Sequence, residues 1–216
     1  MSPSLPQRLV IPGPAGPLQA VIEDPRDADT TPPAAFAVVC HPHPLHGGTM
    51  HNKVAHTLAR ALREQGGAVL RFNFRGVGAS VGVHDGGIGE TGDALAAAAE
   101  MRERWPVLPL VLAGFSFGAG VAMRAAATVQ PDWLVCIAPA VDRVPLDGFV
   151  APACPWLILQ GDADEVVDPA SVVRWAGEAP GAPQLVMLPG VGHFFHGQLG
   201  LLRSVVVQEL SPRQPL

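Results

Sequence analysis

The chain is poor in charged residues and contains no long apolar run. Both shortages limit the classes of function that the protein can have. Charged residues make up 15% of the 216 positions, the formal net charge is −5, and no run of Lys or Arg occurs. A basic surface for nucleic acid or an anionic membrane is therefore missing. No stretch approaches the ~20 apolar residues of a membrane span, and the first residues do not resemble a signal peptide. We expect a cytoplasmic protein with no nucleic-acid or membrane partner.

Cysteine is also scarce. Cys40, Cys136 and Cys154 are odd in number, two of them lie inside apolar runs, and none belongs to a C-x-x-C pair. A disulfide framework, a redox pair and a zinc site each require a cysteine pattern that is missing here. We expect reduced thiols with a structural role.

Apolar runs alternate with helical patterns along the chain. The runs are nearly continuous, which is typical of strands covered on both faces; they are 34–40, 68–74, 109–113, 133–138, 156–160 and 184–188. Helical patterns occupy 52–65, 91–105 and 119–129. Because strand and helix alternate, we expect an α/β fold with a mostly parallel twisted sheet and helices on both faces.

The N-terminal part has a different pattern. Residues 7–11 and 18–23 flank a segment rich in proline and glycine, which predicts an antiparallel hairpin on the edge of the sheet. With 48% hydrophobic residues, the chain can bury one sizeable core and is short for two. We expect residues 1–216 to form a single domain.

The segment 114–118, Gly-Phe-Ser-Phe-Gly, lies between an apolar run and an alanine-rich stretch. A sharp turn from strand to helix pushes a serine hydroxyl out of the sheet and leaves the next N–H free to meet an oxyanion. Gly114 and Gly118 suit positions where strand and helix nearly touch. This context makes Ser116 a candidate nucleophile.

A serine needs a base to take its proton and an acid to orient that base. In open α/β sheets the reacting groups gather at the carboxyl ends of strands. The run 156–160 is followed by three aspartates, Asp162, Asp164 and Asp168, and the run 184–188 is followed by His193 and His196. We favour His193 as the base because the glycines before it allow the loop to fold back toward Ser116. His196 is expected to pack or to bind substrate at the rim.

An oxyanion hole needs two N–H donors. Phe117 N–H follows the nucleophile directly, and the second donor should come from the loop after the third strand. Pro42 and Pro44 have no N–H, so His43 N–H is the natural candidate, with Leu45 behind it.

Together these segments resemble small bacterial α/β-hydrolases without a lid, of the type with His-Pro-His-Pro after the third strand. The resemblance extends over residues 36–197, and its matching pieces are Cys-His-Pro-His-Pro at 40–44, Gly-Gly-Thr-Met at 47–50, Asn52, the stretch 72–80, the turn at Ser116, Gly-Asp-Ala-Asp at 161–164 and Gly192-His193. The order serine, acid, histidine is that of α/β-hydrolases. About sixteen residues separate 138 from 155, where many such hydrolases carry a helical lid, so we expect an open site.

The resemblance also implies which carboxylate is the acid. In the family it typically falls three residues after the glycine that ends the strand, which matches Asp164 after Gly161. Asp162 is the main alternative, and otherwise would bond to backbone N–H groups of the turn. Asp168 precedes Pro169 and is better explained as a helix N-cap.

Two other functions compete for parts of the sequence. The histidines at 41, 43, 46, 51 and 56 suggest a metal site, but they lack a zinc-binding spacing and a carboxylate partner. The segment 87–92 satisfies G-x-G-x-x-G, but it does not follow a strand, and Glu90 would bring negative charge near a pyrophosphate. We expect neither a metal nor a nucleotide cofactor.

The sequence thus predicts a serine hydrolase that cleaves small carboxylic esters through Ser116, His193 and Asp164, with Phe117 and His43 N–H groups in the oxyanion hole and no cofactor. Leu45, Phe115 and Phe194 are the candidate substrate-binding residues. A thioesterase or peptidase with the same triad, and a binding protein that keeps the fold without turnover, are the alternatives. The partner is a small ester or acyl substrate, and a homodimer is compatible with the sequence.

Overall fold

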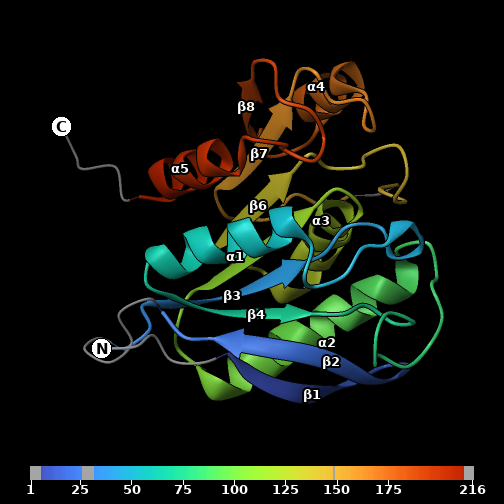
Figure 1. The fold of residues 1–216 in the computed structure, drawn as a ribbon, viewed down its shortest axis with the longest axis vertical. Helices are drawn as coiled ribbons and strands as arrows, with labels where there is room; N and C mark the ends of the chain where they lie inside the picture. The colour runs from blue at the N-terminus through green and yellow to red at the C-terminus, as the bar shows by residue number, and fades with distance from the viewer. Residues whose placement is uncertain (1–5, 26–31, 148, 212–216) are drawn as a thin grey trace.

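The computed structural model describes residues 6–25, 32–147 and 149–211. They form one eight-stranded sheet with the order β1-β2-β4-β3-β5-β6-β7-β8 (Figure 1). The strands are β1 (Gln7–Gly13), β2 (Gly16–Glu23), β3 (Ala35–Cys40), β4 (Gly67–Phe72), β5 (Leu110–Phe115), β6 (Trp133–Ile137), β7 (Trp156–Gly161) and β8 (Gln184–Leu188). The helices are the 3-10 helix η1 (Pro44–His46) and α1 (Lys53–Glu64), α2 (Ile88–Arg104), α3 (Phe117–Val129), α4 (Pro169–Glu178) and α5 (Leu199–Leu210).

The strand pairing confirms the predicted mixed sheet. β1 and β2 form an antiparallel hairpin, and β2 pairs antiparallel with β4. All pairings from β4 to β8 are parallel. The carboxyl ends of these parallel strands therefore lie along one edge of the sheet, where their loops can meet.

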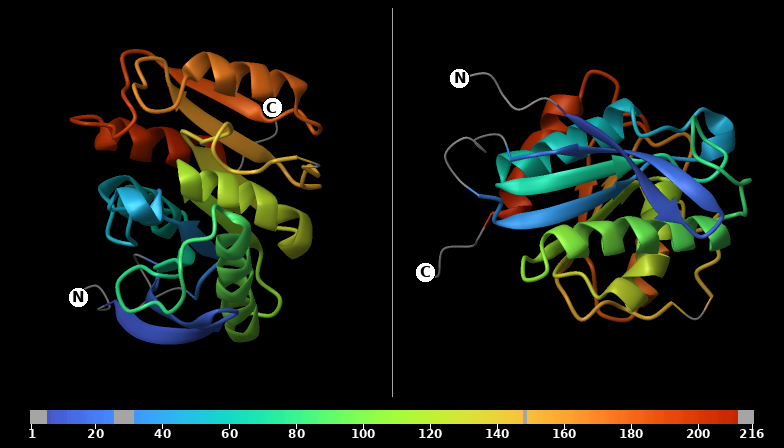
Figure 2. Two further views of the ribbon diagram at one scale, coloured as in Figure 1. Left: turned by 90° about the vertical axis from the view of Figure 1, so that its right-hand side faces the viewer. Right: turned by 90° about the horizontal axis from the view of Figure 1, so that it is seen from below.

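Helices cover both faces of the sheet, as Figure 2 shows in its view from below, where the sheet lies between α1 and α2. Alternate residues of β3 supply the two cores: Phe36 and Val38 face the core that contains α2, α3 and α4, whereas Val39 faces the core that contains α1 and α5. A strand buried on both faces must be apolar throughout, which accounts for the continuous hydrophobic runs. None of the described helices is long and apolar enough to cross a bilayer.

The predicted helices are present, with shifted starts. α3 begins at Phe117 rather than at 119, and α2 begins at Ile88 rather than at 91. The α2 start lies earlier because the Glu90 carboxylate accepts hydrogen bonds from the N–H groups of Asp85 and Gly87 and so caps the helix. The glycine-rich segment 87–92 is thus a helix start that is capped by the buried Glu90 carboxylate.

The sequence predicted only the start of α4, and it did not predict α5. Asp168 does cap α4, as expected, because its carboxylate accepts from the N–H groups of Ala170 and Ser171. α5 has a run of three valines, which favours strand over helix. Its Leu202 and Val206 are buried in the core that also contains α1. Tertiary burial therefore decides the conformation of α5 against its local preference.

The turn from β5 to α3 is tightly packed against β3. A Cβ atom on Gly118 would lie 2.3 Å from the carbonyl oxygen of His41 and 2.4 Å from that of Cys40. A Cβ on Gly114 would lie 2.2 Å from the carbonyl oxygen of Gly118. The expectation that strand and helix nearly touch at these two glycines is confirmed.

His41 joins the loop after β3 to the loop after β4. Its ring is fully buried, Phe74 N–H donates to Nε2 over 3.0 Å, and Nδ1 lies 2.6 Å from Pro42 O. Because Nε2 accepts, Nδ1 carries the proton and donates to Pro42. Burial lowers the pKa of His41 to about 4, although the Pro42 carbonyl opposes this by favouring the charged ring. The His41 ring is therefore neutral, and its role is structural, because it links the two loops through its hydrogen bonds.

Replacing Gly118 with alanine should destabilise the protein by about 2 kcal/mol or more, because the added methyl meets backbone oxygens that cannot rotate away. Urea unfolding measures the change. Gly177→Ala is the control, since that helical glycine has open space around its Cβ position and should leave stability unchanged or raise it by up to about 1 kcal/mol. Equal stability of both variants would contradict the close packing.

The low pKa of His41 predicts a pH-dependent free energy of unfolding. The unfolded chain takes up a proton on His41 near pH 6.5, whereas the folded chain does so only near pH 4. Stability should therefore fall by up to about 3 kcal/mol as the pH drops through this window, because the unfolded state binds more protons there.

Urea titrations at several pH values test this slope. His41→Gln should flatten it, whereas the exposed control His51→Gln should not. A residual slope of the same sign is expected, because burial also lowers the pKa of His43 and of His56. An unchanged slope in His41→Gln would show that His41 is not the titrating group.

Candidate active site

Ser116 occupies the strained turn between β5 and α3. Its backbone has φ 56° and ψ −119°, a conformation that residues other than glycine rarely adopt. Ser116 N–H donates to Ile137 O over 2.8 Å, and Ala140 N–H donates to Ser116 O over 3.2 Å. The ends of β5 and β6 thus hold the turn, which points the serine hydroxyl outward.

Two side chains from distant loops complete a hydrogen-bonded chain with Ser116. His193 Nε2 lies 3.0 Å from Ser116 Oγ, and His193 Nδ1 lies 2.8 Å from Asp164 Oδ2. Because a carboxylate only accepts, Nδ1 carries the proton and Nε2 is free to accept from the serine hydroxyl. Both His193 and Asp164 are buried. This is the geometry in which an imidazole can take a hydroxyl proton.

The loop after β7 holds Asp164 in place. Val166 N–H and Val167 N–H both donate to Oδ1 over 2.8 Å. Burial raises the pKa of Asp164, but the hydrogen bonds from His193 and from these two N–H groups outweigh it, so the net shift is downward. The carboxyl group therefore stays ionised beside the imidazole.

The competing residues lie elsewhere. Asp162 accepts a hydrogen bond from Gly190 N–H over 2.6 Å, so it joins the loops after β7 and β8 as a turn carboxylate. Asp168 is the N-cap of α4. His196 is exposed and its ring packs 5.8 Å from that of Phe194. Asp162 and Asp168 thus have other partners, and Glu165 of the same loop accepts a hydrogen bond from the backbone N–H of His193 over 3.2 Å.

Gln160 also contacts Asp164, and sequence reasoning did not single it out. This fully buried side chain near the end of β7 donates from Nε2 to Asp164 Oδ2 over 3.0 Å and to Gly161 O over 3.1 Å. Its Oε1 has no hydrogen-bond partner in the described part of the chain. A glutamine at the end of an otherwise apolar strand was the available signal, because a buried amide needs partners.

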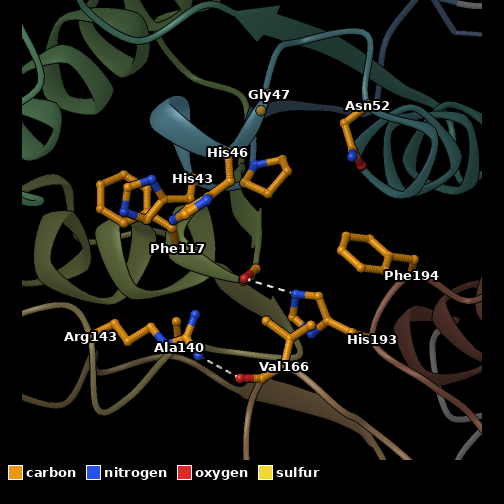
Figure 3. A pocket seen from close by; sticks show the side chains of 13 residues that line it. His43, His46, Gly47, Asn52, Phe117, Ala140, Arg143, Val166, His193 and Phe194 are labelled. Carbon is orange, nitrogen blue, oxygen red and sulfur yellow. Dashed lines mark hydrogen bonds between the residues drawn. The ribbon is translucent and has the colours of Figure 1, made fainter.

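Ser116 is part of the lining of a cavity of about 340 Å³, which Figure 3 shows from close by. Its lining combines the predicted site residues with residues of the loops around them: Pro42, His43, His46, Gly47, Gly48, Asn52, Ser116, Phe117, Ala140, Arg143, Val166, His193 and Phe194. Figure 3 shows His43 and His46 on one side and Arg143, Ala140 and Val166 on another, with His193 between them and Phe194. No Asp or Glu belongs to this lining.

Of the predicted substrate-binding residues, only Phe194 lies on the cavity, with 43% of its surface exposed. Phe115 is fully buried in the core that contains α1 and α5, and its ring packs 4.9 Å from that of His193. The structure therefore corrects the placement of Phe115, because side chains alternate across a strand and this one faces the core. Leu45 is 71% exposed and is not part of the lining.

The predicted oxyanion residues both line the cavity. Phe117 is the first residue of α3, where N–H groups lack a partner within the helix. His43 caps η1, and its Nδ1 accepts from Leu45 N–H over 3.2 Å. The His43 ring packs against those of His46, His84 and Phe117 with centroids 4.6 to 4.9 Å apart. These imidazoles pack as rings, and the described residues contain no group of three or more potential ligands that could hold a metal ion.

The cysteines behave as packing residues. All three are free, and Cys40 and Cys136 are buried. Burial raises the pKa of both of these thiols, so they stay protonated at neutral pH.

Sequence reasoning also missed Arg143 and Val166 as cavity residues. Arg143 lies in the segment that replaces a lid, and Val166 follows Asp164. Neither residue belongs to a recognisable sequence motif. Only the position of Val166 in the loop after β7 could have indicated that it lines the cavity.

Comparison with known proteins gives a consistent family. The family described as serine aminopeptidase S33 matches residues 37–154. XC6422 from Xanthomonas campestris, an α/β serine hydrolase without a lid, is 44% identical with a TM-score of 0.90, over 100% of this chain and 99% of that one. An α/β serine hydrolase homologue from Coxiella burnetii is 39% identical with a TM-score of 0.90, over 98% and 99% of the two chains.

Among curated proteins, the uncharacterised protein RP471 of Rickettsia prowazekii is 42% identical over 143 residues, which is 64% of this chain and 60% of the Rickettsia protein. The match thus spans less than two thirds of that relative. The sheet order, the strained serine turn and the extent of the similarity to XC6422 lead to one assignment: the chain belongs to the α/β serine hydrolases without a lid.

Proposed function

We propose that this protein is a carboxylic-ester hydrolase that works through an acyl-enzyme on Ser116. The observation that carries the proposal is the hydrogen-bonded chain from Asp164 through His193 to Ser116 on an open cavity. A buried, ionised carboxylate beside an imidazole that faces a strained serine is the arrangement that activates a hydroxyl for acyl transfer.

The proposed reaction has two halves. His193 Nε2 takes the proton of Ser116 as Oγ attacks the ester carbonyl, and then delivers this proton to the leaving alcohol. A water molecule next gives its proton to the same nitrogen and attacks the acyl carbon. The bond from this carbon to Ser116 Oγ then breaks, His193 returns the proton to Oγ, and the acid leaves. Asp164 keeps the proton on Nδ1 and stabilises the imidazolium in both halves. The reaction needs no cofactor.

The oxyanion hole is proposed to consist of Phe117 N–H and His43 N–H. Phe117 supports this because the first N–H groups of a helix point out of it and the helix dipole favours negative charge there. His43 supports it because it lines the cavity between two prolines that cannot donate. Each such donor contributes about 3 kcal/mol to transition-state stabilisation.

The cavity lining favours ester over aminopeptidase activity. An aminopeptidase must bind the positive α-ammonium group of its substrate, for which an accessible carboxylate is the usual partner. No Asp or Glu lines the cavity, and Asp164 is 8% exposed with both oxygens already bonded. The cation Arg143 would instead repel an ammonium group.

Replacing Ser116 with alanine should reduce hydrolysis of a p-nitrophenyl short-chain ester by about 10⁴- to 10⁶-fold, with binding and oxyanion contacts accounting for the remainder. Labelling by a fluorophosphonate should be lost as well. Ser204→Ala, on the exposed face of α5, is the control and should retain both. Wild-type protein that neither turns over esters nor becomes labelled would favour a binding protein with this fold.

Two asparagine substitutions test which of the carboxylates Asp164 and Asp162, both after β7, orients His193. Asp164→Asn should lower kcat by about 10⁴-fold, because the amide can donate to Nδ1 and favour the wrong tautomer. Asp162→Asn changes only the contact with Gly190 and should reduce kcat less than tenfold. Steady-state kinetics on one ester decide between them, and a larger loss in Asp162→Asn would overturn the assignment of Asp164.

A further inference from the structure

Arg143 is an exposed cation on the wall of the cavity. It follows β6 in the short segment that leads to β7. Its Nη2 donates to Val166 O over 2.7 Å, a bond visible in Figure 3, where the guanidinium lies beside Ala140 and Val166. A guanidinium has five N–H donors, and this single bond to a backbone carbonyl orients the group while leaving donors free for a ligand.

The charge of Arg143 has no partner within the described residues. It takes part in no ion pair there, although the exposed Asp142 and Asp147 line an adjoining surface hollow that Arg143 also lines. The catalytic-site carboxylate Asp164 is buried behind His193 and its oxygens are bonded. Two arginines with little exposed surface differ, because Arg71 pairs with Glu23 and Arg75 pairs with Asp93.

The other polar residues that line the cavity include no carboxylate that could neutralise the charge of Arg143. Burial, followed by the charges of His84, His46 and Arg143, lowers the pKa of His43, so its ring is neutral at neutral pH. Asn52 contributes an amide whose oxygen caps α1. Among the lining residues, Arg143 is therefore the one whose charge does not depend on pH near neutrality, whereas the whole chain has a formal net charge of −5 with its histidines counted as neutral.

We infer that the ester substrate carries a carboxylate, on its acyl or its alcohol part, and that Arg143 binds this group. The inference rests on the proposed ester hydrolysis and names its substrate class. An oriented guanidinium binds a carboxylate through two parallel hydrogen bonds, which gives both affinity and a fixed position. Arg143 is thus the specificity-determining residue of the cavity.

Matched esters test the inference. Mono-p-nitrophenyl glutarate and p-nitrophenyl valerate have acyl chains of equal length and differ by a terminal carboxylate, and 4-carboxyphenyl acetate and phenyl acetate form the matching pair on the alcohol side. For each pair, the measured quantity is the ratio of kcat/KM for the charged over the neutral ester. Comparing this ratio between variants cancels differences in intrinsic reactivity.

In at least one pair, Arg143→Gln should lower this ratio by about tenfold or more relative to wild type, as expected for loss of a charge-assisted hydrogen bond. Arg143→Lys should keep part of the preference, because it keeps the charge but not the planar fork. Added salt should reduce the wild-type ratio. The control Arg174→Gln, which removes an exposed arginine of α4 outside the cavity lining, should leave the ratio unchanged.

Ratios in Arg143→Gln within twofold of wild type for both pairs would overturn the inference while leaving ester hydrolysis established. A binding measurement keeps the two proposals separate. In the Ser116→Ala background, monomethyl glutarate should raise the Tm more than the neutral methyl valerate does, because a ligand of the folded state stabilises it. This difference should vanish in Ser116→Ala/Arg143→Gln, and its persistence there would also count against Arg143 as the anion site.

Discussion

The close approach of α3 to β3 is the constraint on which the site depends. At Gly118 the helix lies so near the carbonyl oxygens of Cys40 and His41 that no side chain fits. This contact keeps the helix tight against the sheet directly after Ser116, which must then adopt a positive φ. The strained serine is therefore a consequence of packing at its neighbours.

The same contact aligns the two loops that face the serine. The loop after β3 starts at the oxygens touched by Gly118, and the neutral His41 ring ties it to the loop after β4. The loop after β8 reaches the serine from 77 positions along the chain, through the bond between His193 and Ser116. Rigid strand ends thus hold groups that no local preference could bring together.

Electrostatics divides the cavity into two parts. Behind the serine, the buried Asp164 carboxylate accepts from N–H donors and stabilises the proton on Nδ1 of His193. On the side of the cavity, the neutral His43 ring and Arg143, which is hydrogen-bonded to Val166 O, face the open space. A negative group therefore lies inside the protein wall and a positive group lies where a substrate would enter, which is why charge on the substrate should matter.

Strand positions, the serine turn, and the order of serine, acid and histidine could be read from the sequence, because they depend on local hydrophobic patterns and on glycines next to one another in the chain. The tertiary structure decided the rest. It placed Phe115 in the core and Arg143 on the cavity, made a helix of the valine-rich segment of α5, and brought Gln160 against Asp164. These outcomes depend on which side of a strand faces a neighbour and on contacts between residues far apart in the chain, and a one-dimensional pattern does not contain that information.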